Sequence, residues 1–372
     1  MSSTSDKQAK PLATPFEKIH GLGNDFVVIS LEHALNAPIV RDALKEGKDP
    51  LPELARRLCD RHYGIGGDGL IIGFPLSASS SAPPSSVAID LQNRFLSQFG
   101  YAYPGSSSCD IAWIYINSDG SPSQMCGNGL RCLALWAVER KIVATSIFLV
   151  STRVGPIKVE YKGPSTITVD LGQPILNAQA IPLAGVGDGH FIRKPIAVGS
   201  RQYAATCLSM GNPHCVIYMD SESLMGSDQK GIDGGAPARF PAHLSSLAPA
   251  IQALPLFPEG VNVEFAAAET KDRARLFVWE RGCGPTLACA SGAAATLVAG
   301  VLEGRLDREC EIVLPGGSLY VSWSKDDDRV RMTGPASSAF TGEVDLDHLL
   351  SLKQRTPSAK PLSQRLKEAR CR

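Results

Sequence analysis

The chain of 372 residues is long enough for about two domains of ordinary size. Its 37 Lys and Arg residues balance its 37 Asp and Glu residues, so no overall positive charge favours a nucleic-acid partner. Hydrophobic residues make up 44% and charged residues 20%, which is typical of a globular protein. No apolar run approaches the ~20 residues of a membrane span, so we expect no membrane partner.

The first segment, residues 1–15, is polar and is expected to form a flexible tail. It lacks the apolar core of a secretory signal, which favours a cytoplasmic protein. Its Ser and Thr content leaves an organelle transit peptide, and hence the plastid stroma, as the alternative.

Short β-rich runs alternate with helical patterns through residues 16–172. Helices are predicted over residues 51–61 and 130–140, where apolar residues recur at helical spacing. Residues 75–86 are rich in Ser and Pro and begin an insertion that reaches to about residue 108. The predicted strands are Phe26–Ile29, Leu70–Ile72, Ile111–Ile116, Ile147–Val150, Ile157–Tyr161 and Ile167–Leu171.

The same pattern then runs a second time. A Cys-x-x-Gly turn precedes an Ala-rich or Leu-rich helix at both Cys126 and Cys289, the second helix being predicted over residues 293–303. The shared landmarks that surround these turns are Gly23-Asn24 and Gly211-Asn212, Gly155 and Gly317, and Gly172 and Gly334. These landmarks follow one another in the same order and at near-equal spacing in both parts of the chain, which indicates a duplicated α/β (α+β) unit.

The duplication predicts two similar halves, residues 16–172 and 173–336, with a site for a small molecule in the cleft between them. Residues 337–352 are expected to close the fold by returning to the first half. Residues 353–372 carry seven Lys and Arg residues and one Glu, and are expected to form a solvated basic tail; a docking or anion-binding tail is the alternative.

Two of the ten cysteines are distinguished by their equivalent positions in the repeat. No C-x-x-C pair occurs, so zinc ribbons and thioredoxin motifs are excluded, and the other eight cysteines are expected to be packing residues. Cys126 and Cys289 each begin a predicted helix, where unsatisfied N–H groups and the helix dipole favour a thiolate. We therefore expect lowered thiol pKa values at both positions.

Two thiols that face one carbon from opposite sides can invert its configuration. One thiolate removes a proton and the other thiol returns one, which is a two-base racemisation. Helix N-termini that bind the substrate carboxylate would stabilise the carbanion-like transition state, so we expect neither a metal nor a pyridoxal cofactor.

These motifs resemble those of the diaminopimelate epimerases. The similar segments lie between about residues 16 and 343, and they include FEKIHGLGNDFVVI (16–29), RHYGIGGDGLI (61–71), INSDGSPSQMCGNGLRCLA (116–134), SMGNPHCV (209–216), GVNVEF (260–265) and VWERGCGPTLACASGA (278–293). The resemblance implies two pseudo-symmetric domains, each a sheet wrapped around a central helix. It also implies cofactor-independent interconversion of LL- and meso-diaminopimelate in lysine and peptidoglycan precursor synthesis.

Residue by residue, the resemblance implies that Cys126 and Cys289 are the base and acid pair. It implies a substrate site made of asparagines, a Glu-Arg pair and the first helical residues: Asn24, Asn117, Asn212, Asn262, Glu280, Arg281, Gly127, Asn128, Ala290 and Ser291. His214, together with Glu280, would help set thiol protonation. Taken singly, the asparagines could be turn residues, the Glu-Arg pair a surface pair and His214 a structural histidine.

The chain departs from the family pattern at three positions. Gly69 stands where some members have Gln, Ala290 where Gly is usual, and Ala293 where some members have Cys. A Cβ at Ala290 would slightly narrow the approach of a carboxylate. None of the three departures removes a proposed acid, base or charged binder.

Other functions stay open from the sequence alone. A related two-cysteine racemase that acts on proline, hydroxyproline or histidine would not need Asn117, Asn212, Asn262 and Arg281 together. A non-catalytic amino-acid-binding protein would not need two thiols at symmetric helix starts, and isomerases of this fold without the cysteines are disfavoured. The sequence also leaves open whether the protein forms a homodimer.

Overall fold

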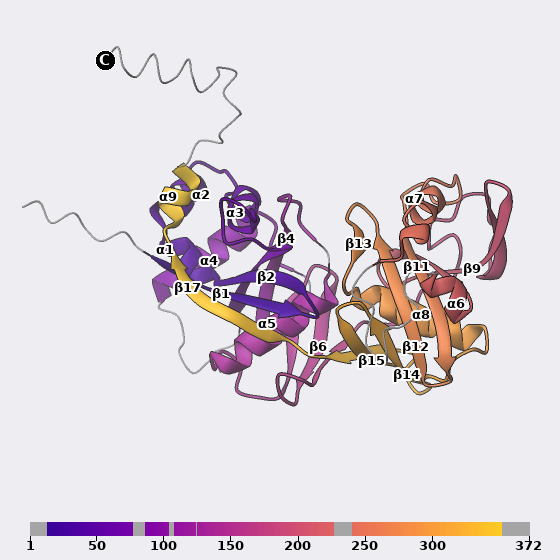
Figure 1. The fold of residues 1–372 in the computed structure, drawn as a ribbon. Coiled ribbons are helices and arrows are strands. Elements are labelled where there is room, and N and C mark those ends of the chain that lie inside the picture. The colour runs from indigo at the N-terminus through magenta and orange to yellow at the C-terminus, as the bar shows by residue number, and fades with distance from the viewer. Residues whose placement is uncertain (1–12, 77–85, 104–107, 124, 227–239, 352–372) are drawn as a thin grey trace, which may run out of the picture.

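The computed structural model describes residues 13–76, 86–103, 108–123, 125–226 and 240–351, and it has two lobes (Figure 1). The first lobe contains β1 (Thr14–Gly21), β2 (Asn24–Ser30), α1 (Leu31–Asn36), α2 (Pro38–Lys45), α3 (Leu51–Cys59), β3 (Gly69–Pro75), α4 (Ser86–Gln98), β4 (Ile111–Asn117), α5 (Gly127–Glu139), β5 (Ile147–Thr152), β6 (Gly155–Tyr161) and β7 (Ile167–Asp170).

The second lobe begins with the hairpin of β8 and β9 and ends at β16, after which the chain returns to the first lobe. Its elements are β8 (Phe191–Val198), β9 (Arg201–Ser209), β10 (Pro213–Tyr218), α6 (Ser221–Met225), the 3₁₀ turn η3 (Ala242–Leu244), α7 (Leu247–Gln252), β11 (Asn262–Thr270), β12 (Arg273–Glu280), β13 (Gly284–Thr286), α8 (Ala290–Leu302), β14 (Glu309–Leu314), β15 (Gly317–Trp323) and β16 (Val330–Gly334). The last two elements are β17 (Ser337–Val344) and α9 (Leu346–Ser351).

Strand pairing repeats between the lobes. In the first lobe β1–β2 is antiparallel, β2–β3 parallel, β3–β4 antiparallel, β4–β5 parallel, and β5–β6–β7 antiparallel. In the second lobe β9–β10, β10–β11, β11–β12, β12–β14 and β14–β15–β16 follow the same sequence of directions. The fold class is thus confirmed: two similar α/β halves.

The two sheets are joined at β7 and β16, which pair antiparallel. In this pairing Val169 lies opposite Met332 and Asp170 opposite Arg331, so the pseudo-two-fold relation between the halves exchanges the two strands. The hydroxyls of Thr168 and Thr333 are 2.8 Å apart across the junction. One continuous ladder therefore connects the halves.

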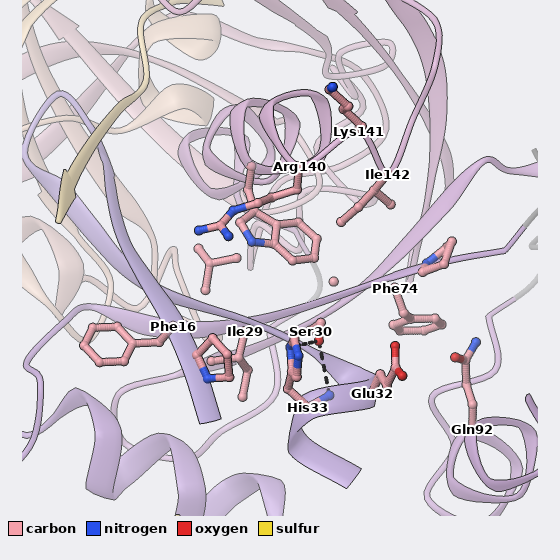
Figure 2. A pocket seen from close by; sticks show the side chains of 15 residues that line it. Phe16, Ile29, Ser30, Glu32, His33, Phe74, Gln92, Arg140, Lys141 and Ile142 are labelled. Carbon is pink, nitrogen blue, oxygen red and sulfur yellow. Dashed lines mark hydrogen bonds between the residues drawn. The ribbon is translucent and has the colours of Figure 1, made fainter. Parts of the chain in front are cut away.

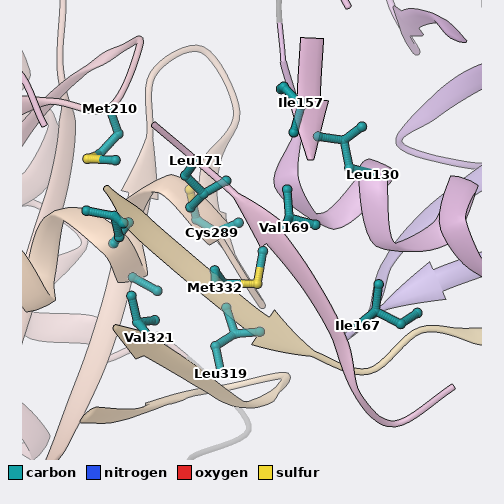
Figure 3. Packing of buried hydrophobic residues seen from close by; sticks show 14 of the residues in the cluster. Leu130, Ile157, Ile167, Val169, Leu171, Met210, Cys289, Leu319, Val321 and Met332 are labelled. Atoms are coloured by element: carbon teal, nitrogen blue, oxygen red, sulfur yellow. The ribbon is translucent and has the colours of Figure 1, made fainter. Parts of the chain in front are cut away.

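Each half surrounds one buried helix. Helix α5 contacts β1, β2, β3, β6 and β7, and α8 contacts β9, β10, β11, β14, β15 and β16. Both helices are apolar around most of their circumference, which suits a central position. One hydrophobic core contains residues of both halves, and Figure 3 shows Leu171, Met332 and Cys289 of this core near the paired strands β7 and β16.

Strand β17 carries the chain back across the molecule. It pairs antiparallel with β1, and α9 then packs against α2 and α3 (Figure 1, yellow). In the second half the equivalent edge position, beside β9, is taken by β8. The edge of the first sheet is thus covered by the C-terminal part of the chain.

The predicted elements differ from the observed ones mainly at their ends. The predicted helices 130–140 and 293–303 begin three residues earlier in the structure, because Cys126 and Cys289 are themselves the N-caps. The predicted insertion contains helix α4. Expectations for the N-terminal tail up to residue 12, for residues 77–85 and for the basic tail fall outside the described residues. No helix in the described part of the chain is long and apolar enough to span a membrane.

Candidate active site

Cys126 and Cys289 occupy matching positions at the starts of the two central helices. Each has extended backbone angles, and each Sγ accepts a hydrogen bond from the backbone N–H three residues on, at 3.4 Å in both cases. The residues that follow them touch: a Cβ built on Gly127 would lie 2.6 Å from the Cβ of Ala290. The two helix N-termini therefore meet at the junction of the halves.

Two asparagines surround Cys126. The Oδ1 atom of Asn24 lies 3.9 Å from Sγ of Cys126 and accepts from Nδ2 of Asn128 at 3.2 Å. The same Nδ2 donates across the junction to the carbonyl oxygen of Ala288 at 3.1 Å. Within the described part of the chain, the buried Oδ1 of Asn128 has no hydrogen-bond partner. Asn128 thus links both halves and keeps one unused acceptor in the first turn of α5.

A carboxylate and a hydroxyl lie close to Cys289. Ser291 Oγ is 3.5 Å from Sγ of Cys289, and Glu280 also lies within hydrogen-bonding range of this thiol. Glu280 is held by Thr286, whose hydroxyl donates to it at 2.6 Å. Burial raises the pKa of Glu280 above its ordinary value.

A chain of hydrogen-bonded polar side chains lies next to this carboxylate. Nδ1 of His214 is 2.7 Å from Oε1 of Glu264, and Nε2 of His214 is 3.0 Å from Oδ1 of Asn212. Both His214 and Glu264 are completely buried. A Cβ built on Gly292 would lie 3.1 Å from Glu264, so this chain reaches the first turn of α8.

The remaining predicted binders are held by backbone contacts or by loop residues. Asn262 donates to the carbonyl oxygen of Pro213 and accepts from the backbone N–H of Arg281. The exposed guanidinium of Arg281 donates to the carbonyl oxygen of Glu259 at 2.7 Å. Nδ2 of Asn117 donates to Ser121 at 3.0 Å. Asn262 therefore positions Arg281, and its own side chain is already hydrogen-bonded at both ends.

The thiol pKa values are raised, and the expectation of lowered values was wrong. Burial raises the pKa of Cys126 to about 11, and burial together with the charge of Glu280 raises that of Cys289 well above its ordinary value. The N–H groups of the helix starts lower both values, but by less. Burial therefore opposes the ionisation of both thiols in the free protein.

Two groups of residues around the site were not predicted from the sequence. Glu264 has one visible signal, a carboxylate between the apolar residues Val263 and Phe265 of strand β11. The other group is an ion-pair network in which Asp68 accepts from Nδ2 of Asn24 at 2.7 Å and is bound by Arg61, which also binds Asp25. This network holds Asn24 toward Cys126. Arg61 lies 36 residues after Asp25 and 7 residues before Asp68, a spacing that no local pattern reveals.

The three departures from the family pattern have local explanations or fit their surroundings. A Cβ at Gly69 would lie 2.5 Å from the ring of Tyr115, so that ring fills the space of a side chain. The Cβ of Ala290 points at Gly127, and Ala293 is fully buried in the core.

Nine of the cysteines are described, and no disulfide joins any two of these nine. Most of those outside the helix starts are buried, as expected for packing residues, but Cys283 is exposed, so the expectation was wrong for that residue. Among the described residues, no three His, Cys, Asp or Glu side chains gather as they would around a metal ion.

Two cavities lie away from the two cysteines. One of about 230 Å³ is enclosed by β1, β2, α1, β3 and the end of α5, with Trp136, Arg140 and Phe74 in its wall (Figure 2). Another of about 450 Å³ opens beside the turn before Asn24 and is lined by Lys18, Asp25, Arg61 and Leu287, among others. Neither cavity is lined by Cys126 or Cys289.

Solved structures with similar folds are distant in sequence. A hydroxyproline epimerase from Agrobacterium vitis, with bound trans-4-hydroxy-L-proline, is 15% identical, with a TM-score of 0.56 over 89% of this chain and 91% of that one. A probable proline racemase from Agrobacterium radiobacter is 12% identical, with a TM-score of 0.56 over 92% and 94% of the two chains. These similarities concern the fold alone.

The sequence comparisons are closer. A diaminopimelate epimerase of Heliobacterium modesticaldum is 39% identical over 336 residues, which are 89% of this chain and 99% of that protein. Another, from Synechocystis, is 35% identical over 90% of this chain and all of that protein. The family profile described as diaminopimelate epimerase matches residues 16–177 and 206–339. The chain belongs to the diaminopimelate epimerase family.

Proposed function

We propose that this protein is an isomerase that interconverts LL- and meso-diaminopimelate with Cys126 and Cys289 as its two acid–base groups. The observation that carries the proposal is the meeting of two cysteine-capped helix starts at the junction of the halves. The family membership supports the substrate, because the relatives that cover nearly the whole chain are diaminopimelate epimerases.

The geometry supports a division of labour around the reacting carbon. The first N–H groups of α5 and α8 have no intrahelical partners and would bind the α-carboxylate. The unpartnered Oδ1 of Asn128 would accept from the ammonium group. One sulfur, as thiolate, takes the Cα proton while the other thiol delivers a proton to the opposite face, so the two sulfurs exchange protonation states in each turnover.

The far end of the substrate needs its own binders. Arg281 is exposed and is positioned through its backbone by Asn262, so its guanidinium is available for the distal carboxylate. Asn24, Asn117 and Asn212 would complete the binding of the two amino-acid ends, and His214 with Glu264 would hold Asn212 in place. We further propose a cytoplasmic enzyme without a cofactor that supplies lysine and peptidoglycan precursors.

The deciding experiment incubates the purified protein with LL-diaminopimelate in D₂O and separates the stereoisomers formed. We expect meso-diaminopimelate that carries deuterium at the inverted carbon. Cys126→Ala and Cys289→Ala should each abolish the conversion while the melting temperature is retained. Cys283→Ala is the matched control, because this thiol is exposed and lies outside the proposed pair, and it should leave the rate unchanged.

Two outcomes would contradict the proposal. Full activity in Cys126→Ala or Cys289→Ala would exclude the two-base mechanism. No reaction with diaminopimelate, together with racemisation of proline, hydroxyproline or histidine, would transfer the assignment to another amino-acid racemase of this fold.

A further inference from the structure

The cavity in the first half, here called the α5 cavity, lies at the end of α5 that is remote from the proposed site. Cys126 is the N-cap of this helix, whereas Trp136, Arg140 and Lys141 line the cavity at its C-terminal end (Figure 2). The volume of the cavity is about 230 Å³. The chemistry proposed above for the two thiols therefore leaves this space without a use.

The second half fills the equivalent place with a tyrosine. Ser30 ends β2 and lies opposite Gly73 of β3. In the second half Tyr218 ends β10 and lies opposite Ala266 of β11, and both Ser30 and Tyr218 follow the asparagine of a Gly-Asn pair by six residues. The Tyr218 ring is buried, and its hydroxyl donates to the carbonyl oxygen of Thr296 on α8 at 2.8 Å. A ring thus lies beside the central helix of the second half, where the first half has only a serine.

The ring of Trp136 is a fixed wall of the α5 cavity and does not fill it. A Cβ built on Gly73 would lie 2.4 Å from Cζ3 of Trp136, so the ring rests on the backbone of β3. Trp136 is buried, which fixes the ring in this place. Phe74 and Phe16, which are also buried, extend the aromatic lining. The cavity therefore offers aromatic surface to a guest.

The cations around the α5 cavity are directed elsewhere, but the carboxylate of Glu32 is not. Arg140 forms an ion pair with Glu17, with Nη2 at 3.0 Å from the carboxylate. Figure 2 shows the carboxylate of Glu32 directed toward the side of the cavity formed by Phe74, and the amino group of Lys141 directed away from both. Over the ranges that the structure describes, no ion pair or hydrogen bond engages the carboxylate of Glu32. The charge left to the cavity is therefore negative.

A carboxylate beside aromatic rings is suited to an organic ammonium ion. The carboxylate attracts the cation, the faces of the rings add to this attraction, and the hydrocarbon part of the guest displaces water from the apolar wall. A cavity of about 150 Å³ already holds benzene, so the larger α5 cavity can hold a ring that carries a short aminoalkyl chain. The second half combines the same two groups within its own chain, because the guanidinium of Arg305 lies over the Tyr218 ring, 5.1 Å from its centroid.

We propose that the α5 cavity is a second ligand site, which binds an organic ammonium ion with a hydrocarbon body the size of one ring. The ammonium group lies at Glu32, and the ring lies against Trp136 and Phe74. Binding is non-covalent and transfers neither a proton nor an electron. The proposal goes beyond the isomerisation of diaminopimelate and does not depend on it.

The test compares two probes of similar shape and opposite charge. The full-length protein is titrated with 2-phenylethylammonium chloride and, separately, with sodium phenylacetate. Calorimetry gives each Kd, and the indole N–H signals of the four tryptophans, followed by NMR, locate the binding. Trp136→Phe assigns the signal of Trp136. We expect 2-phenylethylammonium to bind with one-to-one stoichiometry and to shift this signal, and phenylacetate to bind about tenfold more weakly.

Three variants separate the charge from the space. Glu32→Gln removes the negative charge at nearly constant volume and should raise the Kd of 2-phenylethylammonium about fivefold. Ser30→Tyr should abolish binding, because it places a ring where Tyr218 lies in the second half. Ser30→Ala is the matched control. It loses the same hydroxyl, which accepts from the backbone N–H of His33 at 3.2 Å, but leaves the cavity open and should keep the wild-type Kd.

The proposal is overturned if neither probe binds, if phenylacetate binds as tightly as 2-phenylethylammonium, or if the Trp136 signal does not shift. An unchanged Kd in Glu32→Gln would also contradict it. If Ser30→Tyr does not fold, the two probes and Glu32→Gln decide. Since no titration requires turnover, a failure to epimerise diaminopimelate would overturn the proposed function and leave this result standing.

Discussion

Glu280 is the residue whose charge acts on both thiols. It raises the pKa of Cys126 and of Cys289, and its own pKa is raised by burial. Thr286 fixes its orientation at 2.6 Å. A carboxylate between two acid–base groups opposes the formation of either thiolate, so it favours the resting state in which at least one sulfur keeps its proton.

Removing this charge should therefore make both thiols more acidic. In Glu280→Gln the side chain keeps its size and can still accept from Thr286, but no negative charge faces the sulfurs. Alkylation of each cysteine by iodoacetamide can be followed separately over a range of pH by mass spectrometry of peptides. We expect the midpoint pH of alkylation to move to lower pH for both Cys126 and Cys289. Unchanged midpoints at both cysteines would show that Glu280 is protonated, and therefore neutral, throughout the pH range.

Single residues show what the sequence could and could not predict about the site. Cys126 and Cys289 could be predicted because their spacing repeats and because helix starts have a known capping chemistry. The raised thiol pKa values could not, since burial depends on which segments cover the site. The hydrogen bonds from Asn128 to the carbonyl oxygen of Ala288, and from the buried Arg131 to that of Pro335, join residues 160 and 204 positions apart, which no local pattern encodes.

At the scale of elements, the meeting of α5 and α8 decides how closely the two thiols approach. Gly127 on α5 faces Ala290 on α8, and these residues hold equivalent positions after the two cysteines. The Cβ of Ala290 fills the contact, and a Cβ added at Gly127 would lie only 2.6 Å away from it. A close contact of this kind between two backbones cannot be relieved by turning a side chain.

This contact predicts a paired effect of two substitutions. Gly127→Ala should push the helix starts apart, lower stability by about 1–3 kcal/mol and reduce kcat more than tenfold, because the sulfurs no longer face one carbon. Ala290→Gly in the same chain removes the opposing Cβ and should restore most of both losses. The measurements are melting curves and initial rates for the two single variants and the double variant. Additive losses in the double variant would show that the two residues do not oppose each other.

The order of elements could be predicted only in part from periodicity. Strands β2 to β7 coincide with the apolar runs in the sequence, because each run is buried on both faces or alternates toward the central helix. Short helices such as α1 and α2 were missed, since two turns carry too little periodicity. Helix α1 packs on β1, β2 and β3, and α2 packs against α1 and against α9, which is distant in sequence.

At the scale of the whole molecule, three connections make the halves interdependent. The sheets join through β7 and β16, the core around α5 and α8 is shared, and β17 runs from the second half along β1 of the first (Figure 1). Because no half can lose its packing without exposing part of the other, we expect one cooperative unfolding transition.

Helix α9 offers a test of this interdependence far from the cysteines. Leu346 is 0% exposed in the core between α9, α2 and α3, so Leu346→Ala should lower the free energy of unfolding by about 2–5 kcal/mol. Calorimetry should show a single unfolding peak that moves to lower temperature, because both halves unfold together. Phe340→Ala is the matched control, because Phe340 on β17 is 50% exposed and should shift the peak less. A peak that splits into two would instead show that the first half unfolds on its own and that the shared core does not couple the halves.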